Sequence, residues 1–354
     1  METKRLASNS ALKFLILLLL IIFPVSSFAS VGSIEKMSGT SYFRQKGSDK
    51  WAVAGIGQPV DAGDKVKTGP DGRMSLKFID GSKLNVGNSS ELEITEFLLR
   101  KRNRSAVFSL STGKARAIIN KFSGSTDIKV KTPTSVSGVK GTDFIVMNQG
   151  SANVFFGESG KVEVSGDKGE PVYLKRSTMT ENTVGASPVA PVRVEQGSAL
   201  EEVRAELEAI TDADKPVEWE KAGQLPNILA RWNINYGDYL ADGKRYTEAL
   251  EVFKIAIDLT ELKQIKAEAH LERGTVLARN MNEPQKALEE YNTVIQDYPE
   301  TPSAENAIFS AGIVNTELEN RQEATRLFKK YLAQYPQGVH KDTVEFFLRF
   351  LERD

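Results

Sequence analysis

The 354-residue sequence predicts two parts of different fold class, an N-terminal all-β domain and a C-terminal all-α stack of helix pairs. Before about residue 195, short apolar runs alternate with turn signals, and no segment has sustained helical periodicity. After Ser198 the apolar residues recur at spacings of three and four, as in amphipathic helices. From about Asn227 one pattern occurs three times, which is typical of stacked structural repeats.

Composition excludes several classes of function. A formal net charge of −1 argues against a strongly basic nucleic-acid-binding protein, and the absence of cysteine excludes disulfides, thiolate catalysis and thiolate metal sites. His270 and His340 lie seventy residues apart, and neither has a metal-ligand partner three or four residues further on. No phosphate-binding glycine loop or hydrolase nucleophile motif occurs. We therefore predict a protein that is not an enzyme and has no cofactor, no metal and no nucleic-acid partner.

Residues 1–29 are typical of a secretory signal peptide. Three cationic residues precede the apolar run Phe14–Phe23, and Ser27–Ala29 offers small residues for cleavage before Ser30. The ten-residue run is shorter than the roughly 20 apolar residues that span a bilayer. The pattern predicts export to a bacterial periplasm. The alternative is an uncleaved N-terminal anchor in the inner membrane, with the rest of the chain facing the periplasm.

The stretch from Val60 to Val86 indicates a compact unit of short strands. Apolar residues at positions 74, 76 and 78 alternate with polar residues at 73, 75 and 77, as in a strand with one buried face. Glycine accepts a positive φ and aspartate hydrogen-bonds the local backbone, so both favour turns. Three such turn signals separate the apolar runs: Gly63-Asp64, Asp71-Gly72 and Asp80-Gly81-Ser82.

Four signatures in this region resemble the FecR domain, in the family's order: residues 60–68, 76–84, Thr132-Pro133 with 139–146, and 157–164. The resemblance implies an envelope-side β domain over residues 30–166, built as a roll, a short β-solenoid or a sandwich. Lys140 stands where the family usually has arginine, which removes a planar bidentate contact. The signature residues to which the resemblance gives a structural role are Gly63, Asp64, Thr68, Asp80, Gly81, Ser82, Gly141, Thr142 and Phe144.

The family's best-known role, transmembrane signalling to a sigma factor, uses a cytoplasmic segment ahead of a membrane-spanning helix. Only thirteen residues precede the apolar run here. We therefore expect that this role does not carry over simply.

Residues 100–140 hold ten Lys or Arg against one acid, Asp127. The densest cluster suggests a patch for an anionic surface, such as lipid head groups, cell-wall polymer or an acidic protein. The alternative is a solvated hairpin tip, because Lys and Arg are also common on exposed strands. The cluster consists of Arg100, Lys101, Arg102 and Arg104.

Residues 167–197 are rich in Gly and Pro and predict a linker with possible edge strands. Ser198 and Glu201 then have capping-box spacing, so an amphipathic helix should begin there and form a helical connector over 198–226.

Residues 227–354 contain three copies of one pattern, spaced 38 and then 37 residues apart. Each copy has a glycine, an alanine twelve or thirteen residues later, and an aromatic residue four positions after the alanine. This resembles the tetratricopeptide repeat (TPR), which implies antiparallel helix pairs that approach closely at the glycine, with the aromatic filling the gap between repeats. Residues 338–354 predict a final helix that caps the stack. The glycines are Gly237, Gly274 and Gly312, and the aromatics are Phe253, Tyr291 and Phe328.

By this resemblance the first helix of each repeat would line a groove that binds a segment of another envelope protein. The positions three before and one after each glycine would face the partner: Ile234, Asp238, Leu271, Thr275, Phe309 and Ile313. We therefore expect a non-enzymatic envelope scaffold or adaptor. Two alternatives remain open. One is a FecR-type signal-transduction component without its own anti-sigma segment, and the other is a protein that binds peptidoglycan, another polysaccharide or an outer-membrane component.

Overall fold

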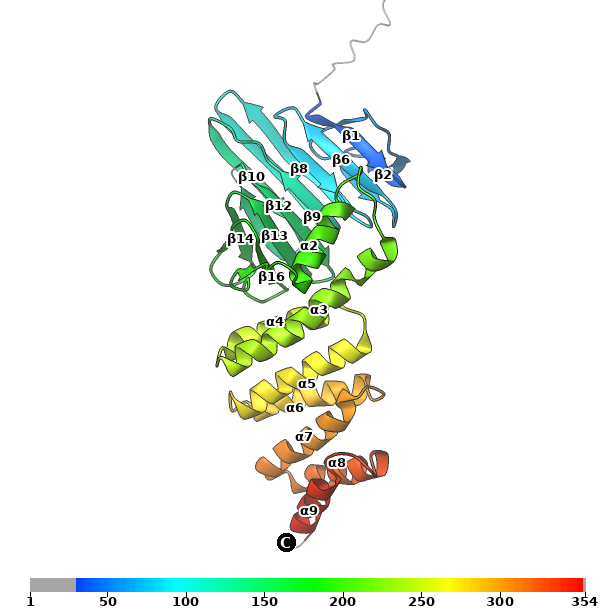
Figure 1. Ribbon diagram of the computed structural model, residues 1–354, viewed down its shortest axis with the longest axis vertical. Coiled ribbons are helices and arrows are strands. Elements are labelled where there is room, and N and C mark those ends of the chain that lie inside the picture. The colour runs from blue at the N-terminus through cyan, green and yellow to red at the C-terminus, as the bar shows by residue number, and fades with distance from the viewer. Residues whose placement is uncertain (1–29, 140, 353–354) are drawn as a thin grey trace, which may run out of the picture.

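The computed structural model describes residues 30–139 and 141–352. The predicted signal peptide, residues 1–29, and the departure at Lys140 both lie outside the described residues. The β domain forms one end of an elongated molecule, and the helices stack away from it one after another (Figure 1).

The β domain is a sandwich of two sheets that share one long strand, β9 (Asn103–Ile118). We call them sheet A and sheet B. The C-terminal part of β9 pairs with strands of sheet A, and its N-terminal part pairs with strands of sheet B. Sheet A also contains β1 (Gly32–Ser38), β4 (Pro59–Val60), β6 (Arg73–Phe78), β7 (Lys83–Val86), β12 (Asp143–Gln149), β13 (Ala152–Ser159), β16 (Thr178–Asn182) and β17 (Val192–Arg193).

Sheet B contains the remaining strands, and β10 runs parallel to β9 while the other pairs in both sheets are antiparallel. Side chains from both sheets, including Leu76, Phe108 and Phe144, bury a common core. Of the three architectures that were left open, the structure is therefore the sandwich. The strands of sheet B are β2 (Ser41–Arg44), β3 (Ala52–Val53), β5 (Lys65–Thr68), β8 (Glu91–Arg100), β10 (Ser125–Lys131), β11 (Ser135–Val139), β14 (Val162–Gly166) and β15 (Val172–Leu174).

Strand β6 is the alternating segment that the sequence predicts, with Met74, Leu76 and Phe78 in the core. Its opposite face is not solvated as expected, because Arg73 and Ser75 are buried as well. Helix α2 (Ala199–Ile210) and the loop after it cover this outer side of sheet A, and Arg73 donates hydrogen bonds to their backbone carbonyls.

The segment 167–197 contains the short strands that the sequence suggested, but these strands pair within the β domain, so the segment is not a linker. It contributes β15, β16 and β17, and β16 pairs with β13 along five residues. The expected boundary at residue 166 is therefore too early. The Gly and Pro residues that suggested a linker lie in the turns between these short strands.

Helices α3 to α8 form three antiparallel pairs, and α9 packs on the last of them. The first pair begins at Trp219, eight residues before the expected start of the repeats. The helices are α3 (Trp219–Asp242), α4 (Tyr246–Leu259), α5 (Lys263–Arg279), α6 (Pro284–Asp297), α7 (Ser303–Glu317), α8 (Arg321–Gln334) and α9 (Lys341–Leu351).

The three repeat glycines lie directly beneath the three repeat aromatics. A Cβ added at Gly237, Gly274 or Gly312 would lie 2.4–2.5 Å from a ring carbon of the aromatic in the same helix pair. Each aromatic therefore packs between the two helices of its own pair. The expected position was the gap between one repeat and the next. Phe328 does both, because its ring also stacks on Phe347 of α9 at 5.6 Å.

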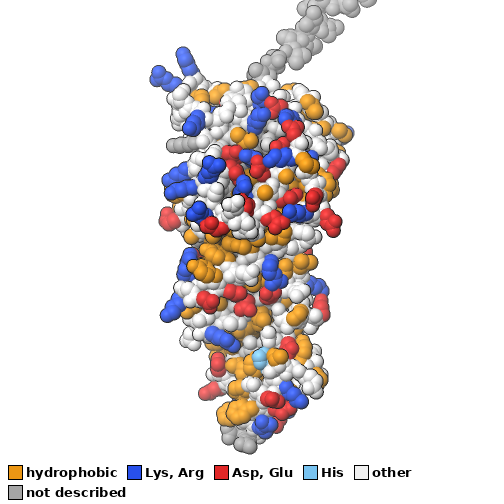
Figure 2. Space-filling model, in the orientation of Figure 1, with side chains coloured by type: hydrophobic (Ala, Val, Ile, Leu, Met, Phe, Trp, Pro, Cys, Tyr) orange, Lys and Arg blue, Asp and Glu red, His pale blue; other side chains and the backbone are white. Residues whose placement is uncertain are grey.

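The β domain and the first helix pair share one apolar core. Side chains on the outer face of sheet A, including Met147, Phe156 and Met179, pack with side chains of α2, α3, α4 and α5. Figure 2 shows hydrophobic side chains across the level where the two parts meet. This continuous packing fixes the helical stack relative to the sandwich. Within the described residues, no helix is both long and apolar enough to cross a bilayer.

Candidate partner-binding surface

The first helix of each pair lies beside the first helix of the next, because α3 contacts α5 and α5 contacts α7. The groove positions expected on these helices fall into two groups. Ile234 is 2% exposed and Leu271 is 8% exposed, so both belong to the core and cannot contact a partner. The prediction that these two residues face a partner is therefore wrong, because they pack against neighbouring helices of the stack.

The other four expected groove residues reach the surface to different degrees. Asp238 is exposed, and Thr275 is half-buried with its hydroxyl donating to the Leu271 carbonyl at 3.0 Å. Phe309 and Ile313 are half-buried and line one pocket between α5 and α7. The structure therefore brings together only the pair in the third repeat.

This pocket has a volume of about 300 Å³ and is lined by both apolar and polar side chains. Besides Phe309 and Ile313, Ala278 and the buried ring of Tyr291 line it, and burial raises the pKa of Tyr291. Its remaining lining residues are Arg279, Ser310, Val314 and Glu317. A pocket that combines apolar side chains with a cation, a carboxylate and a hydroxyl is suited to a partner segment that offers one apolar side chain and polar groups beside it.

His340 holds one wall of the pocket in place. Its imidazole stacks flat on the ring of Phe309, with centroids 3.9 Å apart, and its Nε2 lies 2.9 Å from Asn306 Oδ1. Burial lowers the pKa of His340. His270 lies elsewhere, with its Nδ1 2.6 Å from a carboxylate oxygen of Glu290. Both histidines thus have the packing and surface roles that their spacing predicts.

The neighbouring part of the inner face, between α3 and α5, is acidic. Burial, together with the charges of Asp238 and Glu268, raises the pKa of Glu272 to about 7. Glu268 accepts a hydrogen bond from Arg231 at 2.6 Å. Sequence reasoning missed Glu268 and Glu272, although they lie six and two positions before Gly274. The helical spacing from Thr275 places them on the same helix face, and that signal was available.

The FecR signature residues in the first half of the motif have structural roles. Asp64 is buried and its carboxylate accepts the backbone N–H groups of Lys46 and Asp61, each at 2.8 Å. Thr68 donates its hydroxyl to the Gly87 carbonyl at 2.6 Å. Gly63 has a φ of 96°, which is strained for any residue with a Cβ.

The second half of the motif follows the same pattern. Asp80 accepts hydrogen bonds from both the backbone N–H and the hydroxyl of Ser82 at 2.9 Å, and Gly81 has a φ of 78°. Gly141 also has a positive φ, and Thr142 and Phe144 are buried. These side chains support turns and the core, and none of them is offered to a ligand.

The basic cluster divides in two. Arg104 is buried and donates to Asp80 Oδ2 at 2.8 Å and to the Asn120 carbonyl at 2.7 Å, so it is not part of a surface patch. Arg100, Lys101 and Arg102 are exposed at the tip of the β8–β9 hairpin. Figure 2 shows Lys and Arg side chains projecting from that end of the β domain. The anionic-surface hypothesis stays a prediction for these three residues alone.

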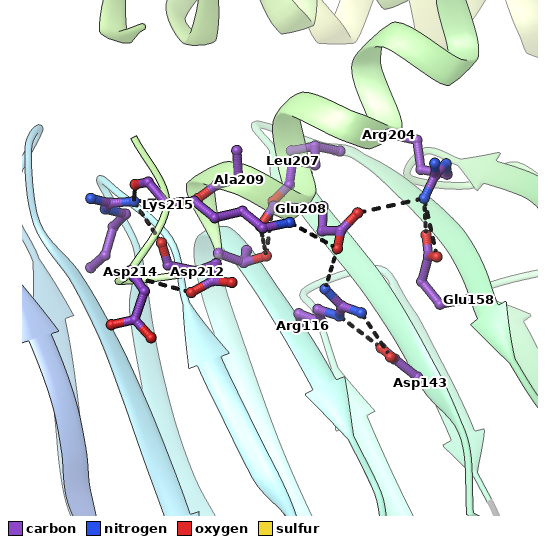
Figure 3. Close-up of polar contacts among 12 residues, drawn as sticks. Arg116, Asp143, Glu158, Arg204, Leu207, Glu208, Ala209, Asp212, Asp214 and Lys215 are labelled. Atoms are coloured by element: carbon purple, nitrogen blue, oxygen red, sulfur yellow. Dashed lines mark hydrogen bonds and ion pairs between the residues drawn. The ribbon is translucent and has the colours of Figure 1, made fainter. Parts of the chain in front are cut away.

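A polar network fastens α2 to sheet A (Figure 3). Arg116 makes a bidentate contact with Asp143, at 2.9 and 2.8 Å, and also reaches Glu208 of α2 at 3.1 Å. Arg204, one turn earlier on α2, contacts both carboxylate oxygens of Glu158. Bidentate arginine–carboxylate pairs are the strongest class of side-chain hydrogen bond, so the helix that leads into the stack has a defined position.

No group of three or more His, Asp and Glu side chains in the described part of the chain is arranged to hold a metal ion.

Comparison with known proteins supports both halves of this description. The family model described as FecR protein matches residues 64–163, and a tetratricopeptide repeat model matches residues 268–301. No curated protein sequence matches the chain.

Three solved structures illustrate the similarity. A crystal structure described as a "putative anti-sigma factor" from Parabacteroides distasonis has 14% identity and a TM-score of 0.33. The match covers 40% of this chain and 64% of that chain, so this chain spans less than two thirds of that structure. The Arabidopsis OM64 TPR domain has 20% identity and a TM-score of 0.29, over 34% of this chain and 94% of that one.

The second TPR domain of human RPAP3, solved in complex with an HSP70 peptide, has 17% identity and a TM-score of 0.30, over 36% of this chain and 99% of that one. The FecR model matches residues of the β sandwich, and the tetratricopeptide repeat model matches residues of the helical stack. The chain therefore combines a FecR domain in its β sandwich with a tetratricopeptide repeat in its helical stack.

Proposed function

We propose that this protein is a non-enzymatic adaptor of the bacterial envelope, which binds a segment of another envelope protein along the inner face of α3, α5 and α7. The observation that carries the proposal is the pocket between α5, α6 and α7, where the half-buried side chains of Phe309 and Ile313 reach the surface beside polar side chains. A partner that inserts one apolar side chain there would remove that surface from water, which favours binding.

The fixed junction supports an adaptor rather than two independent modules. Because sheet A and helices α2 to α5 share one core, a partner held on the helices has a defined position relative to the sandwich. The same packing determines which experiments are informative. Cutting the chain near residue 197 would expose this apolar core, so the test uses the full chain with point substitutions.

The test is a photo-crosslinking residue at Ser310, followed by purification from the native envelope and identification of the cross-linked protein. We expect one dominant adduct, which Ile313→Asp abolishes because it replaces an apolar side chain that lines the pocket with a charged one. Val339→Asp is the matched control, since Val339 is 83% exposed. Thermal melting of both variants separates lost binding from lost folding.

An adduct that persists in folded Ile313→Asp, or no adduct at all, would contradict partner binding at this pocket. Location is tested separately. The proposal requires the protein in the periplasmic or membrane fraction, with Ser30 as the first residue if the signal peptide is cleaved.

FecR-type signal transduction is the second candidate, and the rigid junction is the observation that favours it. A ligand on the sandwich would shift the helices with it, because the two parts share a core. A neighbouring gene for a sigma factor or an outer-membrane receptor would support signalling. The signalling role would be contradicted if deletion of the gene for this protein left the levels of the transcripts controlled by that sigma factor unchanged.

A further inference from the structure

Gly138 lies in the middle of β11, on the outer face of sheet B. Its register neighbours are Lys129 on β10 and Glu163 on β14, and Glu163 is in turn paired with Tyr173 on β15. These four residues form one row across four adjacent strands. The row lies on the outer face of sheet B, because buried residues flank Lys129, Gly138 and Glu163 on both sides, and Tyr173 is exposed next to the buried Leu174. Gly138 leaves a gap in this row.

The fold itself gives no reason for a glycine at this position. Glycine inside a strand costs about 0.5–1 kcal/mol relative to alanine, and it commonly marks a bulge, a bend, a close backbone approach or a ligand. The register of β11 shows no shift against β10 or β14, and the φ of Gly138 lies outside the left-handed region. An added Cβ would meet no atom of a described residue within 4 Å. The backbone therefore does not require a glycine here, and the missing side chain leaves free space on the exposed face of the sheet.

The gap is the floor of a shallow pit of about 440 Å³ that is open along the face of the sheet. Among the described residues, its lining carries two cations and two carboxylates, so it has no excess of either charge. Lys129 pairs with Asp127 at 3.1 Å. This arrangement offers hydrogen-bond donors and acceptors side by side, which suits a ligand with many hydroxyls. The lining residues are Thr126, Asp127, Lys129, Gly138, Val139, Lys161, Glu163 and Tyr173.

Tyr173 forms a fixed aromatic edge to the pit. Its side chain is 44% exposed, on the short strand β15. The Lys161 ammonium lies 3.7 Å from the ring centroid, and a hydrogen bond with Glu163 raises the pKa of the Tyr173 phenol. An aromatic ring that is already held in place loses little conformational freedom when a ligand packs against it. The C–H face of a sugar ring packs well on such a surface, while its hydroxyls reach the charged groups.

We propose that this pit binds a neutral polysaccharide chain, with one sugar ring seated over Gly138 and against Tyr173. The open, shallow shape lets a polymer pass across the sheet, and the balanced lining favours an uncharged chain over an acidic or a basic one. The site is independent of the partner-binding pocket, because it lies on the sandwich and not on the helices.

The deciding variant is Gly138→Val in the full chain. Valine suits a strand, and its side chain has free space here, so the variant should fold with unchanged or higher thermal stability. It also fills the pit. The probes are chitohexaose, cellohexaose and maltohexaose, titrated by calorimetry and by two-dimensional NMR. We expect at least one to bind the wild-type chain, and Gly138→Val to weaken that binding at least about tenfold.

Three further variants make the test specific. Gly55→Val is the matched control, since a Cβ at Gly55 also meets open space but lies in a loop away from the pit, and it should bind as wild type. Tyr173→Ala should weaken binding and Tyr173→Phe should retain it, because the ring makes the contact. Absence of binding by all three sugars at millimolar concentration, or equal binding by wild type and folded Gly138→Val, would overturn the proposal.

Discussion

Asp80 and Arg104 form a buried ion pair, in which Arg104 Nη1 lies 2.8 Å from Asp80 Oδ2 and both side chains are at most 2% exposed. The pair ties the Asp80-Gly81-Ser82 turn of sheet A to the long strand β9. Arg104 also donates to the Asn120 carbonyl and lies over the ring of Phe122. This one arginine thus joins a turn, a strand and a loop that are distant in sequence.

Arg104→Gln should therefore be strongly destabilising. The substitution leaves the Asp80 carboxylate buried without its cation, and breaking a buried pair in this way costs about 3–5 kcal/mol. Urea unfolding followed by circular dichroism measures the change. Arg102→Gln, at the exposed hairpin tip, is the control and should unfold as the wild type does. Equal loss in both variants would mean that Arg104 acts through overall charge and not through the pair.

Gly312→Ala should destabilise the helical stack. The new Cβ would lie 2.4 Å from a ring carbon of Phe328, and overpacking of this kind costs about 1–3 kcal/mol. Gly223→Ala is the matched control, because Gly223 also lies within a helix and a Cβ there meets no described atom within 4 Å. That change should stabilise by up to about 1 kcal/mol. Similar melting temperatures for the two variants would refute close approach at the repeat glycine.

Glu181 predicts a pH dependence at the junction between the sandwich and the helices. Burial raises the pKa of Glu181 to about 8, and the one described hydrogen bond to its carboxylate comes from Asn233 Nδ2 at 3.1 Å. From pH about 4.5 to 8 the folded protein keeps a proton that the unfolded chain releases. The free energy of unfolding should therefore fall by up to about 1.4 kcal/mol per pH unit over this window and stop falling above it.

Glu181→Gln should remove that slope, because glutamine does not ionise and its amide can also donate to Asn233. The raised pKa of Glu272, about 7, acts in the same direction, so the informative quantity is the difference between wild type and variant at each pH. Unfolding midpoints measured from pH 5 to 9 supply it. A difference that does not change with pH would show that Glu181 titrates normally.

Arg73→Met should release α2 from the sandwich. The guanidinium donates to the carbonyls of Asp212 and Lys215 at 2.6 Å, just beyond the C-terminus of α2. Loss of a hydrogen bond from a charged group lowers the free energy of unfolding by about 1.5–3 kcal/mol. We expect faster hydrogen exchange in residues 199–215, measured by mass spectrometry. Lys36→Met removes an exposed ion pair with Asp214 in the same region and should leave exchange unchanged. If hydrogen exchange is unchanged in Arg73→Met, apolar packing alone holds α2 on the sandwich.

The sequence by itself determined the features that depend on local chemistry. Turn signals at Gly63, Asp71 and Asp80 predicted where strands end, because backbone conformation there depends on the residue itself. The spacing of glycine and aromatic residues predicted the helix pairs, since the glycine of the first helix and the aromatic of the second are where the two helices touch. The family resemblance added the order of these signals along the chain, and the family models confirm it.

Only the tertiary structure decided which surfaces are covered. Arg104 and Arg73 look like solvated strand residues until a turn and α2 pack over them. Ile234 has the position of a groove residue, but the outer face of sheet A and its neighbouring helices enclose it. The alternation of polar and apolar residues tells which side chains share a face. It does not tell what packs on that face, because burial depends on segments that are far away in the sequence.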